Sequence, residues 1–154
     1  MRILFIILTF VISSTTVFSQ CPHWVGEDYS RSVALQPIVE KYLVFKMTKD
    51  NSDSSSITYK DKDGFSMMKI NIAQKTQLRG TELVTVRGNA TNIYIEGPAD
   101  RIDNLINEYF TPLVQPCKAQ ISSSTILWDS YRVSIYDKGN FNGIPMKYIY
   151  IEKP

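Results

Sequence analysis

Apolar residues recur most clearly with the period of an α-helix in the middle of the chain. Between Pro98 and Phe110 the apolar side chains are spaced by three and four positions, which places them on one face of a helix. Pro98 suits the first turn of a helix, and Pro112 is expected to end it because proline lacks the N–H that a helix interior requires. The apolar positions are Ile102, Leu105, Ile106, Tyr109, Phe110 and Leu113.

Strand-like alternation of apolar and polar residues precedes this helix. Residues 57–60 and 65–73 flank Asp63-Gly64, a pair that favours a tight hairpin turn because both residues tolerate positive φ. Residues 38–47 fit a short helix and a strand about equally well. We expect that segment to begin as a short helix and to turn into a strand.

Two further pairs of strands are predicted. Residues 82–87 and 92–96 flank a short turn signal, Gly88-Asn89, which favours antiparallel neighbours. After the helix, residues 126–136 and 146–152 flank a segment rich in glycine and asparagine, which indicates a C-terminal hairpin.

The order of these elements predicts the fold class. Strands, one long helix and then more strands follow one another without βαβ alternation. The economical solution is an α+β fold, in which an antiparallel β-sheet built from hairpins carries one long amphipathic helix on one face. No internal repeat and no long linker is apparent, so residues 20–154 are expected to form a single domain.

The N-terminus has the pattern of a secretory signal peptide. Arg2 precedes an apolar run from Ile3 to Ile12, which ends at a polar stretch long before the roughly 20 apolar residues that a membrane-spanning helix needs. Val17 and Ser19 supply small residues for cleavage, and we place the cut after Ser19. The expected mature protein, residues 20–154, is therefore secreted or periplasmic and has no integral membrane span.

Two cysteines, Cys21 and Cys117, are expected to form a disulfide because an even count in an exported protein favours pairing. Closing a loop of that length stabilises a fold by roughly 4–5 kcal/mol in the chain-entropy description. The alternative is that Cys21 carries the lipid of a bacterial lipoprotein. Lipoproteins have a small residue before that cysteine, whereas this chain has Gln20.

Charge and motif content argue against several function classes. The 17 basic and 15 acidic residues are scattered, which gives no basic footprint for nucleic acid or anionic membrane. The single histidine, His23, lies near Glu27 and Asp28, but the repeated Cys and His spacing of a zinc site is missing. The chain has no nucleophile-elbow motif and no glycine-rich phosphate loop. We therefore expect no metal and no cofactor.

Carboxylates on predicted strands keep a hydrolase under consideration. Glu82, Glu96, Asp129 and Glu152 lie on or near strands, and a glycosidase uses two such groups. Spacing along a sequence does not set the distance between two carboxylates. Surface positions are the usual place for acidic side chains.

The chain contains nine tyrosines, several of them in the predicted C-terminal hairpin. Tyr148 and Tyr150 alternate with other residues in the last strand, and Tyr131 and Tyr136 lie in its partner. An exposed strip of these rings would suit another exported protein or a glycan as partner, because tyrosine offers a rigid face with a polar tip. The alternative is that the rings pack under the helix or pair with one another across the hairpin.

Three functional hypotheses follow. The first is an exported, non-catalytic binding module for a protein or a glycan. The second is a small secreted hydrolase that uses carboxylates or His23. The third is an inhibitor or immunity-type protein, which would present the loop at residues 137–143 or use the last strand as a sheet edge that accepts a partner strand.

Overall fold

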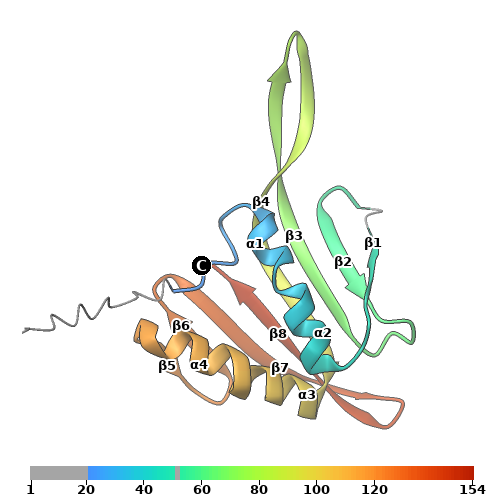
Figure 1. Ribbon diagram of the computed structural model, residues 1–154, viewed down its shortest axis with the longest axis vertical. Coiled ribbons are helices and arrows are strands. Elements are labelled where there is room, and N and C mark those ends of the chain that lie inside the picture. The colour runs from blue at the N-terminus through green and yellow to red at the C-terminus, as the bar shows by residue number, and fades with distance from the viewer. Residues whose placement is uncertain (1–20, 51–52) are drawn as a thin grey trace, which may run out of the picture.

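One antiparallel sheet of eight strands forms the framework of the molecule, and the helices cover one of its faces (Figure 1). The structure, a computed structural model, describes residues 21–50 and 53–154. The predicted signal peptide, with its cleavage after Ser19, lies outside the described residues. The predicted α+β class and the antiparallel sheet built from hairpins are confirmed.

The strands are ordered β1-β2-β3-β4-β8-β7-β6-β5 across the sheet. Their bounds are β1 Thr48–Asp50, β2 Ser56–Lys60, β3 Met67–Arg79, β4 Glu82–Pro98, β5 Gln120–Ile121, β6 Thr125–Trp128, β7 Tyr131–Phe141 and β8 Ile144–Glu152. The helical segments are α1 Tyr29–Val33, α2 Gln36–Leu43, α3 Ala99–Leu105, the π-helical turn η1 Ile106–Phe110, α4 Thr111–Val114 and the 3₁₀ turn η2 Gln115–Cys117.

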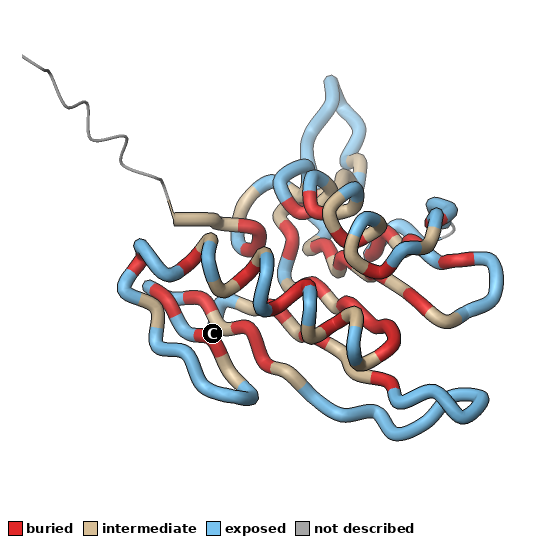
Figure 2. The backbone as a smooth tube through the Cα atoms, turned by 60° about the horizontal axis from the view of Figure 1, so that its bottom comes forward, coloured by how far each residue is buried: buried red, intermediate tan, exposed pale blue. Residues whose placement is uncertain are grey.

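The hydrophobic core lies between the helices and the sheet (Figure 2). Strand alternation directs every second side chain of the central strands toward the helices, and these residues are buried. Burial of large aliphatic side chains of this kind contributes roughly 1.5–3 kcal/mol each. The fully buried members include Val39, Leu43, Met68, Ile70, Ile93, Ile95, Ile102, Leu105, Phe110, Ile149 and Ile151.

The sheet has the same topology when it is followed from either edge. Each half consists of helices followed by a meander of four strands, and the last strands of the two halves, β4 and β8, pair at the centre. Residues 93–98 read Ile-Tyr-Ile-Glu-Gly-Pro and residues 149–154 read Ile-Tyr-Ile-Glu-Lys-Pro. The expectation of no internal repeat was therefore wrong for this short segment.

The predicted turn at Gly88-Asn89 was also wrong. Strand β4 runs without interruption through these residues, and the hairpin between β3 and β4 turns instead at residues 80–81. A Cβ atom on Gly88 would lie 2.7 Å from the carbonyl oxygen of Ala73, so this glycine permits a close approach of two strands. The register of β3 and β4 shifts near this point, as expected at a β-bulge.

The predicted long helix begins where expected but is not one regular helix. Pro98 is the N-cap residue of α3, and the helical path continues past Pro112 to Cys117 through η1, α4 and η2. A π-helical turn precedes Pro112, which relaxes the i→i−4 pattern that a proline would otherwise break. The predicted apolar face is nevertheless the one that is turned toward the sheet, with Ile102, Leu105, Ile106 and Phe110 buried.

The segments on either side of this helical region have different boundaries from those predicted. Residues 38–47 contain the end of helix α2, which terminates at Val44 in the left-handed conformation, and the strand begins only at Thr48. Residues 126–136 are divided between β6 and β7 by a turn at Asp129, whose φ is 48°. Residues 137–141 belong to β7, so the C-terminal turn is confined to Asn142-Gly143.

Candidate functional site

The face of the sheet that the helices leave uncovered is the candidate site. In the register of β4, β8 and β7, Tyr94 pairs with Tyr150, and Tyr150 pairs with Ser134. Their neighbours in each strand, such as Ile93 and Ile151, point into the core. The uncovered face therefore carries Lys69, Asn71, Asn92, Tyr94, Glu96, Arg132, Ser134, Tyr136, Tyr148, Tyr150 and Glu152.

Four tyrosines gather at the centre of this face, and three of them were predicted. Tyr148 on β8 lies between Tyr136 on β7 and Tyr94 on β4. The ring centroids of Tyr136 and Tyr148 are 4.8 Å apart with the planes at 20°, and those of Tyr94 and Tyr148 are 5.2 Å apart at 32°. Tyr136 is the most exposed of the set, at 47% of its surface. Tyr150, which pairs with Tyr94, is the fourth, and Tyr94, Tyr136, Tyr148 and Tyr150 are called the tyrosine cluster below.

A largely buried carboxylate fixes one side of the tyrosine cluster. Glu96 is only 8% exposed, and Lys138 Nζ lies 2.5 Å from its Oε1. The hydroxyl of Tyr94 donates a hydrogen bond of 2.5 Å to Glu96 Oε2. Burial, and then the hydrogen bond to Glu96, raise the pKa of Tyr94 well above its ordinary value. The Tyr94 ring is thus held at both its ring face and its hydroxyl.

A second ion pair lies farther along the same face. Arg132 donates two hydrogen bonds to Glu152 Oε1, with the one from Nε measuring 2.8 Å. Burial, and then the charge of Glu152, raise the pKa of Tyr150. Each of the two carboxylates of the uncovered face, Glu96 and Glu152, thus lies beside a neighbouring cation.

The expectation that Tyr131 belongs to the same strip was wrong. Tyr131 is 4% exposed on the helix-covered side, where its hydroxyl donates a hydrogen bond of 3.0 Å to the carbonyl of Val25. Its ring stacks between those of Trp128 and His23, with centroid distances of 5.5 Å and 4.9 Å. Tyr131 therefore anchors the N-terminal segment rather than facing a partner.

Sequence reasoning missed Tyr94, the fourth member of the tyrosine cluster. The signal was present, because the alternation Ile93-Tyr94-Ile95 matches Ile149-Tyr150-Ile151 in the last strand. Once the two strands are known to pair, equal alternation places Tyr94 and Tyr150 on one face.

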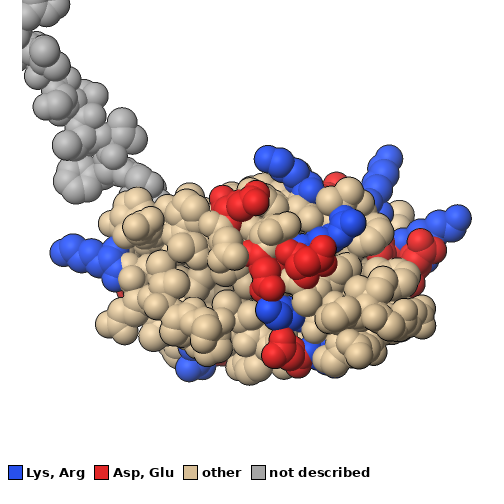
Figure 3. Space-filling view, turned by 90° about the horizontal axis from the view of Figure 1, so that it is seen from below, with Lys and Arg blue, Asp and Glu red and all other residues tan. Residues whose placement is uncertain are grey.

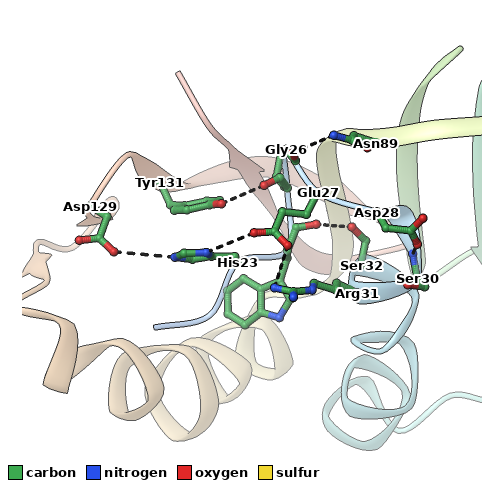
Figure 4. Close-up of polar contacts among 12 residues, drawn as sticks. His23, Gly26, Glu27, Asp28, Ser30, Arg31, Ser32, Asn89, Asp129 and Tyr131 are labelled. Carbon is green, nitrogen blue, oxygen red and sulfur yellow. Dashed lines mark hydrogen bonds and ion pairs between the residues drawn. The ribbon is translucent and has the colours of Figure 1, made fainter. Parts of the chain in front are cut away.

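His23 forms a separate polar group at the other side of the sheet (Figure 4). Its Nδ1 lies 3.5 Å from Glu27 Oε1 and its Nε2 lies 3.9 Å from Asp129 Oδ2. Glu27 also pairs with Arg31 at 2.8 Å. The buried Ser32 hydroxyl donates its hydrogen bond to the carbonyl of Trp24, away from the imidazole. Within residues 21–50 and 53–154, no hydroxyl hydrogen-bonds to His23.

The four carboxylates considered for hydrolysis do not converge. Glu82 lies at the tip of the β3–β4 hairpin opposite Arg79, and Asp129 lies beside His23. Glu96 and Glu152 share the uncovered face, but Glu96 pairs with Tyr148, four residues from Glu152. Four strand residues correspond to about 13 Å. This separation exceeds the roughly 6.5–9.5 Å of an inverting glycosidase and the shorter distance of a retaining one.

The segments proposed for an inhibitor occupy different positions from those expected. The last strand was to accept a partner strand only if it lay at the sheet edge, and β8 instead lies between β4 and β7 at the centre of the sheet. Residues 137–143 form the outer part of the β7–β8 hairpin, where Phe141 and Ile144 are exposed. The end of the molecule seen in Figure 3 carries acidic and basic side chains intermixed, without a broad patch of one sign.

The predicted disulfide is present, with Cys21 and Cys117 bonded and their Cα atoms 5.7 Å apart. The sulfur of Cys21 is therefore occupied, which argues against the lipid-anchor alternative. In the part of the chain that the structure describes, no three His, Cys, Asp or Glu side chains are grouped to hold a metal ion. None of the helices among the described residues is long and apolar enough to cross a membrane.

Comparison with known proteins gives no relative: no protein-family model, no curated protein sequence and no solved structure matches the chain.

Proposed function

We propose that this chain is an exported, non-catalytic module that binds another exported protein through the uncovered face of its sheet. The observation that carries the proposal is the tyrosine cluster, Tyr94, Tyr136, Tyr148 and Tyr150, at the centre of that face. Tyrosine is enriched where proteins bind one another, because it supplies a large contact area at low entropic cost.

The packing of the rings favours a protein partner over a glycan. Sugars stack on the open face of an aromatic ring, whereas Tyr148 has Tyr94 on one side and Tyr136 on the other. Side chains stand roughly perpendicular to a sheet, so such a stack presents ring edges and hydroxyls. Edges and hydroxyls suit the mixed apolar and hydrogen-bonding surface of a protein.

The surroundings of the tyrosine cluster reduce the cost of binding. Glu96 is buried and bonded to both Lys138 and Tyr94, and Arg132 is bonded to Glu152. These contacts hold the rings and charges in place before a partner arrives. Preorganised aromatic residues of this kind are typical of the few residues that carry most of the binding free energy.

The disulfide supports an exported location for the same module. Cys21 and Cys117 are paired, and disulfides persist in oxidising compartments. This agrees with the proposed removal of residues 1–19 as a signal peptide. The protein isolated from its native host should then have the mass of residues 20–154 with both cysteines oxidised.

The test is photo-crosslinking in the native host with p-benzoylphenylalanine in place of Tyr136. We expect one discrete protein adduct, because Tyr136 is exposed beside the stacked rings. A second substitution, Tyr148→Ala, should reduce the adduct at least about tenfold, as expected when a central interface residue is truncated.

The matched control carries the same photo-reactive residue at Tyr42, a half-buried tyrosine on helix α2 in the other layer. Position 42 should not give the adduct that forms at position 136. Identical adducts from both positions, or an adduct that Tyr148→Ala leaves unchanged, would refute the proposed interface.

A further inference from the structure

A pocket of about 320 Å³ lies at one end of the sheet, where the two halves of the fold meet. It is bounded by the segment after α2, the β2–β3 turn, the start of α3 and the start of β8. None of its lining residues belongs to the tyrosine cluster. The lining residues are Phe45, Asp63, Phe65, Pro98, Asp100, Arg101 and Ile144.

Aromatic rings form its apolar wall. Phe65 stacks on Phe45 with centroids 6.5 Å apart and planes at 16°, and Phe141 meets Phe65 edge to face at 5.1 Å. The two lining rings, Phe45 and Phe65, come from separate segments of the chain, and Phe141 contacts Phe65 without lining the pocket itself. Aromatic faces attract cations through their quadrupole, and the guanidinium carbon of Arg101 already lies 5.3 Å from the centre of the Phe45 ring.

The charges of the pocket favour a cationic ligand. Arg101 is already engaged, because its Nη1 donates a hydrogen bond of 2.8 Å to the carbonyl of Leu43. Asp63 and Asp100 are exposed and form no ion pair with any residue in 21–50 or 53–154. The lining therefore has two carboxylates, Asp63 and Asp100, and one guanidinium, Arg101, which gives it a net negative charge.

A third carboxylate lies in the same β2–β3 turn. Asp61 is 8% exposed, and neither of its carboxylate oxygens accepts a hydrogen bond from another described residue. Its backbone N–H donates to the carbonyl of Ser66, whose buried hydroxyl also lacks a partner among the described residues. Buried polar groups without partners are uncommon in folded proteins.

We infer that this pocket binds an ammonium or guanidinium group carried on an apolar stem. The stem would pack against Phe65 and Ile144, and the cation would lie near Asp63 and Asp100. The volume suits a small organic cation or the side chain of a lysine or arginine. The inference goes beyond the proposed function and does not depend on it, because the two surfaces share no residue.

The experiment titrates the oxidised protein, residues 20–154, with benzylamine and with its neutral counterpart benzyl alcohol. Binding is followed by the ¹H–¹⁵N amide resonances of Asp63, Phe65 and Asp100. We expect benzylamine to bind with a Kd of about 1–10 mM and benzyl alcohol at least about fivefold more weakly. Raising the salt concentration should weaken only benzylamine binding, because salt screens exposed charges.

Variants test each part of the pocket. Asp63→Asn and Asp100→Asn should each weaken benzylamine binding about two- to fivefold, as expected for an exposed ion pair. Phe65→Leu keeps an apolar wall but removes the ring, so it should reduce the preference for benzylamine over benzyl alcohol. The matched control is Asp137→Asn, an exposed aspartate on β7 outside the pocket, which should have no effect.

Two results would overturn the inference. One is equal affinity for benzylamine and benzyl alcohol. The other is that Asp63→Asn changes benzylamine binding no more than the control Asp137→Asn does.

Two peptides then distinguish the sources of the cation. Binding of acetyl-Gly-Lys-Gly-amide but not of its norleucine analogue assigns the pocket to a side chain of a protein partner. Binding of benzylamine without the lysine peptide assigns it to a free amine. Either pattern supports the cationic preference.

Discussion

At the scale of single residues, strand alternation decides which tyrosines are available to a partner. Tyr131 and Tyr136 lie five positions apart in β7, and an odd separation in a strand places two side chains on opposite faces. Their odd spacing is therefore a signal in the sequence against a strip that contains both, although the sequence analysis expected one. Which of them faces the core depends on the helices and on the pairing of β7 with β8, which alternation does not specify.

Tyr94 provides a prediction about pH. Its hydroxyl is bonded to Glu96, and burial is the main cause that raises its pKa above the ordinary value of 10.0. Because its pKa is higher in the folded protein, Tyr94 contributes fully to stability below about pH 10. This contribution is lost as pH rises further, because the Tyr94 hydroxyl ionises first in the unfolded chain. Tyr94→Phe should cost about 1 kcal/mol at pH 7 through loss of the hydrogen bond.

The difference in unfolding free energy between the wild-type protein and Tyr94→Phe should therefore shrink as pH rises above 10. Urea denaturation at pH 7 to 11 measures it, and absorbance of tyrosinate follows the ionisation directly. Tyr136→Phe is the control, because Tyr136 is the most exposed ring of the cluster. If the difference in unfolding free energy between the wild-type protein and Tyr94→Phe grew above pH 10, this account of Tyr94 would be contradicted.

At the scale of elements, turn signals were less informative than alternation. Asp63-Gly64 does connect β2 and β3, and Gly64 has a φ of 74° as such a turn requires. Gly88 gave a similar signal yet lies inside β4, where it has no positive φ. Glycine serves both where the chain must turn and where two backbones approach closely. Sequence alone did not separate these two roles.

The interior position of Gly88 predicts that it does not tolerate a side chain. In Gly88→Ala the new methyl group would lie 2.7 Å from the backbone oxygen of Ala73, and backbone moves only with its strand. We expect a loss of about 1–3 kcal/mol in unfolding free energy, measured by urea denaturation. Thr85→Ala, at an exposed position of the same strand, should change stability by less than about 0.5 kcal/mol. Equal effects of the two substitutions would argue against the close approach.

At the scale of the whole molecule, the N-terminal segment connects the two halves of the sheet. Trp128 and Tyr131 of the second half donate hydrogen bonds to the carbonyls of Pro22 and Val25. The N–H of Gly26 donates to the carbonyl of Ala90 in the first half. Cysteine count predicted the covalent bond to Cys117, but these contacts join residues far apart in sequence. They follow from a pairing of β4 with β8 that sequence patterns left undetermined.

Removing the covalent bond should therefore weaken the whole molecule rather than one element. The double variant Cys21→Ser/Cys117→Ser opens a loop of 96 positions, and loss of such a disulfide typically costs 2–5 kcal/mol of unfolding free energy. The hydrogen bonds to Pro22 and Val25 remain, so the variant should keep the sheet but unfold at lower urea concentration. Adding dithiothreitol should bring the wild-type protein to the stability of the variant and leave the variant itself unchanged. A wild-type midpoint that does not respond to dithiothreitol, in protein shown by mass to be fully reduced, would mean that these contacts hold the segment without the disulfide.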